Sequence, residues 1–213
     1  VLFRSNLDQY IRLQQAEMPM VFYDRIPYGM NVSQVIVDDY IKAFFLVEHL
    51  IREGYRHIVH LQGPDDVYNS VERARGYKDA LAKFNIPFNK DRMLKAGLTF
   101  KDGANAADML IEKGISFDAI FAFTDTLAIG AMNRLRDLGK KIPEEIAIAS
   151  FSGTVLSTIV YPQLTTVEPP LQQMGKVVAE LIIEKIKEPL SPNRSIVLDA
   201  EIKLRASSKK EKK

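Results

Sequence analysis

The sequence predicts an α/β fold built around parallel sheets. Short runs of uninterrupted apolar residues recur along the 213-residue chain, and amphipathic segments of helical length separate them. A strand that is apolar on both faces must be covered on both faces, which is typical of a parallel sheet between two layers of helices. Right-handed crossovers between consecutive strands follow from this arrangement.

The first quarter of the chain alternates between the two patterns. Leu7, Tyr10 and Ile11 recur at helical spacing, and Asp38-Asp39 supplies carboxylates suited to the start of a later helix. The predicted elements are a helix over 6–17, strands over 20–23 and 35–37, a helix from 39 that ends at Gly54, and a strand over 57–61.

The same unit repeats up to about residue 150 and then changes. We expect helices over 72–84, 104–113 and 125–138, and strands over 94–96, 119–123 and 146–149. An irregular stretch through Pro162 and Pro169-Pro170 follows, and then a helix over 174–186 and a final strand over 196–204. Ligands of such sheets bind beyond the carboxyl ends of the strands, so the loops to consider are 63–70, 97–103, 124–126 and 151–156.

Composition narrows the class of function. The apolar fraction is 46%, the charged fraction 26% and the net charge +2, a balance that calls for no nucleic acid, membrane or polyanionic partner. Because the chain has no cysteine, disulfides and thiolate metal sites are excluded. The first residues, Val1 to Ser5, contain no methionine, and we expect the chain to be incomplete at its start.

Motifs for catalysis and cofactors are absent. The sequence has no phosphate-binding Gly-x-x-x-x-Gly-Lys loop, no Gly-x-Gly-x-x-Gly and no Gly-x-Ser-x-Gly elbow. His57 and His60 are three apart on a predicted strand and point to opposite faces, so they cannot chelate a metal together. The sequence therefore predicts a protein that is not an enzyme and uses no metal or cofactor.

The order and spacing of several short motifs resemble a known family. They include Ile36-Val37-Asp38-Asp39, Arg73-x-x-Gly76-Tyr77, Asp125-x-x-Ala128-Ile129-Gly130-Ala131 and Pro162-x-Leu164-Thr165-Thr166-Val167. Over residues 18–206 the chain resembles the ligand-binding core of the lactose-repressor/galactose-repressor (LacI/GalR) family of bacterial transcription regulators.

The resemblance implies a periplasmic-binding-protein-like fold of two Rossmann-like lobes joined by three crossover segments, near 37–38, 167–168 and 198–199. One lobe would hold 6–37 and 169–197 and would be incomplete at its start. The other would hold 38–166 and 199–206. A basic tail over 207–213 would be disordered, and the DNA-binding domain would be absent from this chain.

Family positions for effector binding fall on residues that also have simpler explanations. Arg73 matches an effector-contacting arginine whose planar fork of donors suits paired hydroxyls or a carboxylate, although a solvated helix-terminal arginine is the alternative. Asp125 suits either a helix N-cap or a carboxylate facing the cleft, and both can hold. Thr124 stands where the family usually has asparagine.

The most important departure from the family is Ser152, which stands where an aspartate usually accepts hydrogen bonds from effector hydroxyls. Serine has no second carboxylate oxygen, so we expect a changed effector or a changed pose. By resemblance, Asn69, Thr99 and Phe100 lie at the same mouth, where Phe100 either stacks on a sugar or simply packs. Leu171 is the expected apolar floor.

The resemblance therefore implies the effector-binding and dimerisation part of a cytoplasmic repressor. Its partners would be a sugar or similar small polar metabolite, a second copy in a homodimer, and operator DNA through the absent domain. The main rival is an exported sugar-binding protein of a transport system, which shares the fold. A signal peptide upstream would favour the rival and a helix-turn-helix the repressor, while residues 164–175 within the chain favour the regulator.

Overall fold

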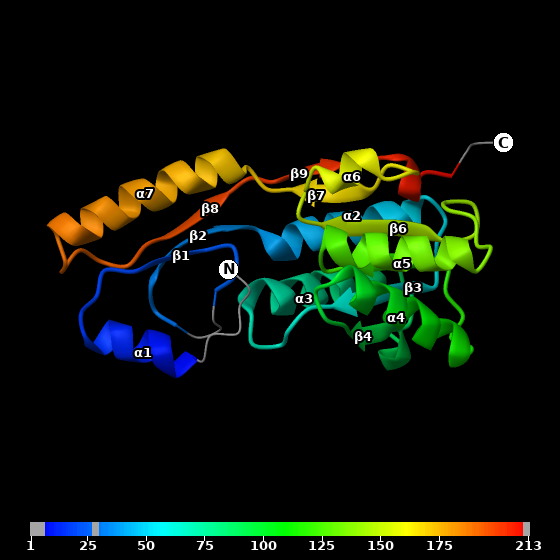
Figure 1. Cartoon of the computed structure of the whole chain (residues 1–213), viewed down its shortest axis with the longest axis horizontal. Helices are drawn as coiled ribbons and strands as arrows, with labels where there is room; N and C mark the ends of the chain where they lie inside the picture. Colours follow the sequence, from blue (N-terminus) through cyan, green and yellow to red (C-terminus); the bar gives the residue numbers. More distant parts are fainter. Residues whose placement is uncertain (1–6, 27–29, 211–213) are drawn as a thin grey trace.

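The computed structural model describes residues 7–26 and 30–210, which form two lobes around two sheets (Figure 1). The smaller lobe has a parallel sheet of order β1-β2-β8. Its elements are α1 (Leu7–Gln15), β1 (Val21–Tyr23), β2 (Ser33–Val37), α7 (Leu171–Lys187) and β8 (Ser195–Leu198). Along β1, Val21 packs toward the core shared with α7, while Phe22 packs against Tyr10 of α1. The alternation of strand side chains thus places the two helices on opposite faces.

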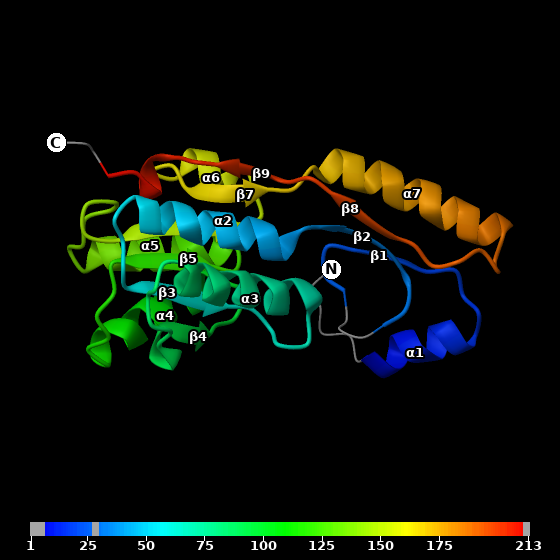
Figure 2. The same cartoon turned by 180° about the vertical axis from the view of Figure 1, so that it is seen from behind.

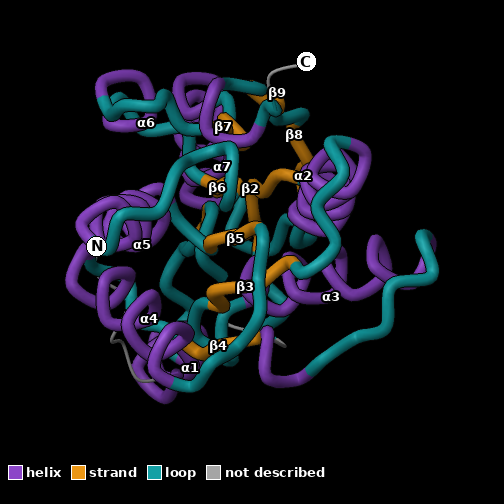
Figure 3. The backbone as a smooth tube through the Cα atoms, turned by 90° about the vertical axis from the view of Figure 1, so that its right-hand side faces the viewer, coloured by secondary structure: helices purple, strands orange, loops and turns teal. Residues whose placement is uncertain are grey.

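The larger lobe has a sheet of order β4-β3-β5-β6-β7-β9, which is parallel except for β9. Two helices cover each face, α2 and α3 on one and α4 and α5 on the other (Figure 3). Its elements are α2 (Asp39–Arg52), β3 (Ile58–Gln62), α3 (Tyr68–Lys83), β4 (Met93–Lys95), α4 (Phe100–Glu112), β5 (Ala119–Ala122), α5 (Asp125–Asp137), β6 (Ala147–Phe151), α6 (Leu156–Ile159), β7 (Thr165–Glu168) and β9 (Glu201–Lys203), with short 3₁₀ turns η1 (Lys90–Arg92) and η2 (Ala206–Ser208).

Central strands of the larger sheet are buried on both faces. On β5, Ala119 and Phe121 join the core under α2 and α3, whereas Ile120 and Ala122 join the core under α4 and α5. All four side chains are fully buried. The predicted α/β class with parallel sheets is therefore confirmed.

The chain passes between the lobes three times, from β2 to α2, from β7 to α7 and from β8 to β9 (Figure 2). The last passage differs from the single strand predicted over 196–204. Val197 pairs with Ile36 of the smaller sheet, and Ile202 pairs with Val167 of the larger sheet. The apolar residues of 196–204 therefore belong to two strands, β8 in the smaller sheet and β9 in the larger sheet. The chain leaves the smaller sheet after Leu198.

Two helices begin earlier than predicted. Helix α3 starts at Tyr68 rather than 72, and its N-cap, Val67, offers no side-chain acceptor. Helix α4 starts at Phe100 rather than 104, because Thr99 and Asp102 form a reciprocal capping box. Both starts lie in the loops where ligand contacts were expected.

The structure also differs from the expected disordered tail. Ser207 and Ser208 are fully buried, and the Ser207 hydroxyl receives the Thr165 amide hydrogen bond at 2.8 Å. Lys210 lies over the ring of Tyr55, with Nζ 4.3 Å from the centroid. Residues 211–213 of the predicted tail, including Lys212 and Lys213, lie outside the described residues.

Across the described ranges, no helix combines the length and apolar character needed to cross a membrane. The same residues contain no group of three or more histidine, aspartate and glutamate side chains placed to hold a metal ion.

Candidate functional site

Arg73 is fixed from three sides at the junction of the lobes. Its Nε donates a hydrogen bond of 2.8 Å to Asp39 Oδ1, and its Nη1 donates one of 2.7 Å to the Phe123 carbonyl. Its guanidinium lies 3.5 Å from the centroid of the Phe151 ring, a cation–π contact. Among the described residues nothing bonds to Nη2, which remains as a donor for a ligand.

Asp39 compensates the charge of Arg73, although burial disfavours the ionised form of its carboxylate. The two side chains are 2% and 3% exposed. Desolvation raises the pKa of Asp39 to about 6, because burial outweighs the attraction of Arg73. The carboxylates of Asp24 and Asp38 raise it further. The site therefore combines two arginines with several carboxylates, because Arg73 pairs with Asp39 and Arg25 Nε lies 4.0 Å from Asp24 Oδ2. Neither arginine offers an uncompensated positive charge.

Asp125 forms a buried hub inside the larger lobe. Its Oδ1 accepts hydrogen bonds of 2.7 Å from the hydroxyls of Ser150 and Thr166. Its Oδ2 accepts bonds of 2.7 and 2.8 Å from the backbone amide and hydroxyl of Thr154. With four donors on its carboxylate and no exposed surface, Asp125 ties α5 to β6 and β7.

The N-cap interpretation of Asp125 is wrong. Thr124 is the N-cap, and its hydroxyl accepts the Leu127 amide bond at 3.4 Å. Asp125 is the first helical residue and turns its carboxylate toward the sheet. Thr124 therefore serves the helix start, and 7% of its surface remains exposed.

Two non-glycine residues with positive φ follow strands at the facing edges of the lobes. Asp24 directly follows β1 with a φ of 57°, and Ser152 directly follows β6 with a φ of 139°. Such conformations cost free energy and cluster at functional sites. The Ser152 amide bonds to the Val167 carbonyl, while its hydroxyl has no partner among the described residues. Ser152 thus presents an available hydroxyl directly after Phe151, whose ring contacts Arg73.

Other expected site residues are placed around this centre. Asn69 is 1% exposed, and its Nδ2 lies 3.5 Å from Asp24 Oδ1 across the two lobes. Leu171 is 62% exposed and lines a cavity of about 440 Å³ where the chain passes from β7 to α7. Gly153 of the larger lobe lines the same cavity, which therefore lies between the lobes.

Thr99 and Phe100 make their described contacts within α4 and with α5. The Thr99 hydroxyl bonds with the Asp102 side chain and amide within its own capping box. The Phe100 backbone is packed so closely on Gly130 of α5 that a β-carbon there would lie 2.0 Å from the carbonyl oxygen. The Phe100 side chain is 46% exposed. The described contacts thus join Arg73 to Phe123, which precedes Thr124, and to Phe151, which precedes Ser152. They join neither Thr99 nor Phe100 to Arg73.

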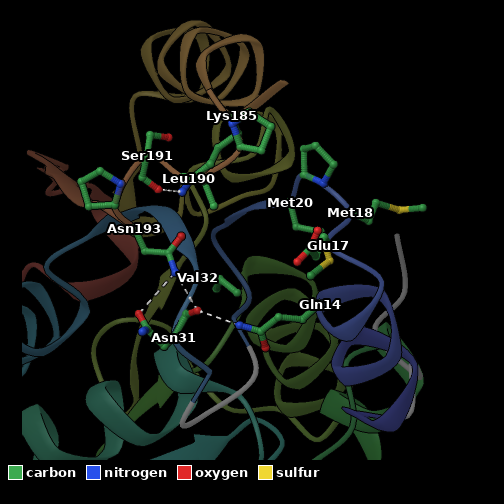
Figure 4. Close-up of a pocket in the computed structure, with 13 residues that line it drawn as sticks. Gln14, Glu17, Met18, Met20, Asn31, Val32, Lys185, Leu190, Ser191 and Asn193 are labelled. Carbon is green, nitrogen blue, oxygen red and sulfur yellow. Dashed lines mark hydrogen bonds between the residues drawn. The ribbon is translucent and has the colours of Figure 1, made fainter. Parts of the chain in front are cut away.

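A further cavity of about 350 Å³ lies at the opposite edge of the smaller sheet (Figure 4). Met20 and Val32 line it just before β1 and β2 begin. Gln14 and Asn193 both donate hydrogen bonds to the Asn31 carbonyl, at 3.1 and 3.0 Å. This cavity is separate from the strand ends that carry Arg73 and Ser152.

Sequence reasoning missed Asp24 and the pairing role of Asp39. Asp39 was singled out only as a helix-start carboxylate, and Asp38 is the residue that caps, accepting the Ile41 amide bond at 2.9 Å. Asp24 directly follows a predicted strand, so its position at a carboxyl end was the available signal.

A family model described as a periplasmic binding protein-like domain matches residues 47–208, well over half of the chain. The chain belongs to this family. Among curated relatives, the HTH-type transcriptional repressor PurR of Vibrio atlanticus (strain LGP32) is 31% identical over 206 residues, covering 97% of this chain and 60% of that protein.

Solved structures of regulators share the family fold with this chain. A putative transcriptional regulator LacI from Bacillus cereus subsp. cytotoxis has a TM-score of 0.91 at 26% identity, covering 98% of this chain and 74% of that one. A transcriptional regulator CelR–cellobiose complex has a TM-score of 0.86 at 28% identity, covering 92% and 60%. The resemblance to LacI/GalR effector-binding cores is confirmed, and the chain spans 58–60% of the first curated relatives' length.

Proposed function

We propose that the chain binds a neutral, hydroxyl-rich small molecule of the sugar class between its two lobes and does no chemistry on it. This proposal rests on the groups that hold the Arg73 guanidinium: the Asp39 carboxylate, the Phe123 carbonyl and the Phe151 ring. One of these three groups is the ring of Phe151, the residue directly before Ser152. A fixed donor nitrogen and a hydroxyl at the same lobe junction suit the alternating donors and acceptors of a polyol.

The charges favour a neutral ligand over an anionic one. Asp39 already compensates Arg73, and the carboxylates of Asp24 and Asp38 act on the same site. A phosphate or carboxylate would meet these acidic groups, while the two arginines of the site, Arg73 and Arg25, are already paired with Asp39 and Asp24. The cellobiose in the related complex belongs to the same neutral class and supports the proposal.

For the whole protein we propose a transcription repressor of the cytoplasm that binds operator DNA through a domain outside this chain. Its relatives are named as transcriptional repressors and regulators, which supports a regulator over an exported transport protein. The proposed lobes, 6–37 with 169–197 and 38–166 with 199–206, would rotate about the three crossings when the ligand binds. A coupling of about 1–3 kcal/mol between ligand and DNA is typical of such switches.

A homodimer is part of the same proposal. Val155, Ile159 and Tyr161 expose 72%, 69% and 79% of their surface within one short segment around α6. Large apolar side chains gathered in this way mark interaction surfaces. A second copy using the same segment would cover both sets in one symmetric interface.

The test is a thermal-shift and calorimetric panel of cellobiose, D-ribose and D-glucose, each compared with its phosphate ester where one exists. At 100 times its dissociation constant a true ligand adds about 2.7 kcal/mol of stability. We expect a neutral sugar to bind, Arg73→Met to abolish binding, and the control Arg134→Met to retain it. Tighter binding of an ester, or binding by Arg73→Met equal to wild type, would overturn the proposal.

A further inference from the structure

The first turn of α3 reaches from the larger lobe into the smaller one. The Tyr68 backbone amide donates a hydrogen bond of 2.9 Å to the Ile26 carbonyl. The Tyr68 side chain packs against a small apolar cluster of the smaller lobe that contains Phe22, Ile26, Val32 and Ile36. One residue of a larger-lobe helix thus supplies both a backbone bond and an apolar contact to the other lobe.

The next two residues of this turn are buried without full hydrogen bonding. Asn69 Nδ2 reaches Asp24 Oδ1 only at 3.5 Å, the long limit of a hydrogen bond, and Asn69 Oδ1 has no partner among the described residues. Ser70 Oγ is also buried without a partner in the described part of the chain, and the residue has no exposed surface. A buried polar atom without a hydrogen-bond partner is unfavourable, so these atoms raise the free energy of this arrangement of the lobes.

The same turn lies directly before the candidate ligand site. Arg73 follows Ser70 by three residues, about one helical turn, and so lies on the same side of α3. Arg73 and Asp39 are 3% and 2% exposed with the lobes in this arrangement. In this arrangement a small molecule therefore has almost no access to the guanidinium. Asp24 of the smaller lobe lies at the same junction, where its Oδ1 is 3.5 Å from Asn69 Nδ2.

We propose that Tyr68, Asn69 and Ser70 form a clasp that holds the two lobes together over Arg73 and must release before a ligand enters. The backbone hydrogen bond and the apolar contact of Tyr68 hold the lobes together. The unpaired atoms of Asn69 and Ser70 raise the free energy of the clasped state and so keep release accessible. This inference rests on the proposed ligand site at Arg73, whose access it explains.

The test measures lobe separation in the chain without any ligand. Because the sequence contains no cysteine, Lys113→Cys and Lys187→Cys give one spin label on each lobe, and a double electron–electron resonance experiment measures their separation. Tyr68→Ala should shift the major population to a longer distance. Phe88→Ala, an aromatic truncation in the larger lobe away from the clasp, should leave the distribution unchanged.

A second variant tests the clasp in the opposite direction. Ser70→Ala removes an unpaired hydroxyl, so it should favour the clasped state and slow hydrogen exchange of the Tyr68 amide. This variant adds no volume and introduces alanine, the residue with the highest helix propensity, so it remains informative where Tyr68→Ala does not fold.

An unchanged distance in a folded Tyr68→Ala, or faster amide exchange in Ser70→Ala, would overturn the clasp. Both measurements are independent of ligand, so such a result would leave the proposed sugar site standing. Conversely, the expected distances together with sugar binding by Arg73→Met equal to wild type would remove the sugar site and keep the clasp.

Discussion

Arg73 Nε donates a hydrogen bond of 2.8 Å to Asp39 Oδ1, and both side chains are almost fully buried. Removing one partner of a buried pair leaves an uncompensated charge in a low-dielectric surrounding. We expect Asp39→Ala to lower the free energy of unfolding by about 3–5 kcal/mol in urea titrations. The control is Asp108→Ala, which breaks the more exposed Arg134–Asp108 pair and should cost at most about 1 kcal/mol. Equal losses in both variants would contradict the dominant role of burial.

Asp125 should stabilise the lobe without contacting the ligand. In Asp125→Asn, an amide donor replaces one acceptor, and an oxygen or a donor of the hub loses its partner. We expect a loss of at least about 1–3 kcal/mol in thermal unfolding, with sugar affinity of the folded fraction unchanged. Thr154→Ser keeps both donors to Asp125 and should remain close to wild type. A large loss of affinity without a loss of stability would place Asp125 in the ligand site after all.

Most of the fold followed from apolar periodicity. Runs such as 119–123 and 146–149 were continuous, and continuous runs of that length are typical of doubly covered strands. The early start of α3 was not predictable from capping rules, because Val67 offers no acceptor and tertiary contacts of Tyr68 set the helix start instead. The boundary between β8 and β9 was hidden for a related reason, since apolar alternation does not show which sheet a strand joins.

The site was predictable in part. Arg73 came from family resemblance, and no local pattern pairs it with Asp39, which lies 34 residues earlier. The N-cap of α5 is Thr124 where Asp125 was predicted, a shift of one residue. Helix starts read from sequence vary by that amount. Asp24 and Ser152 were both at strand ends, but their positive φ values depend on the surrounding chain and leave no signal in residue type.

His60 should give the protein a pH dependence opposite in sign to that of Asp39. Burial lowers the pKa of His60 to about 4, and burial raises the pKa of Asp39 to about 6. The unfolded histidine takes up a proton near pH 6.5, so its contribution to stability is complete above that pH and is lost as pH falls toward 4. The unfolded aspartate loses its proton near pH 4, so its contribution is complete below that pH and is lost as pH rises through 6. Between about pH 4 and 6, the contribution of His60 to the free energy of unfolding therefore rises with pH, while that of Asp39 falls.

The variant His60→Phe should expose the Asp39 slope alone. Phenylalanine keeps the stacking on Phe121, whose ring centroid is 4.6 Å from that of His60. Relative to wild type, the free energy of unfolding of this variant should fall by about 1.4 kcal/mol per pH unit as pH rises from 4 to 6. Urea titrations at half-unit steps measure it, and parallel pH profiles for the two proteins would contradict the assignment.

Ser152 should separate stability from ligand binding. Its φ of 139° is unfavourable for serine and open to glycine, so Ser152→Gly should raise the free energy of unfolding by about 1 kcal/mol. Ser152→Ala retains the strain and should change stability by less than about 0.5 kcal/mol. Both variants lose the hydroxyl and should weaken sugar binding to a similar extent, by about 0.5–1.5 kcal/mol in calorimetry. Unchanged affinity in both variants would remove Ser152 from the site.

The exposed apolar segment around α6 should hold two copies of the protein together. A glutamate at position 159 would place a charge within a desolvated interface, so Ile159→Glu should shift the protein from dimer to monomer in sedimentation velocity. The matched control is Leu190→Glu, which adds the same charge at an apolar residue that is 98% exposed at the far end of the smaller lobe. We expect this control to sediment as wild type, because that surface takes no part in the proposed interface. Dissociation by Leu190→Glu but not by Ile159→Glu would move the interface to the smaller lobe.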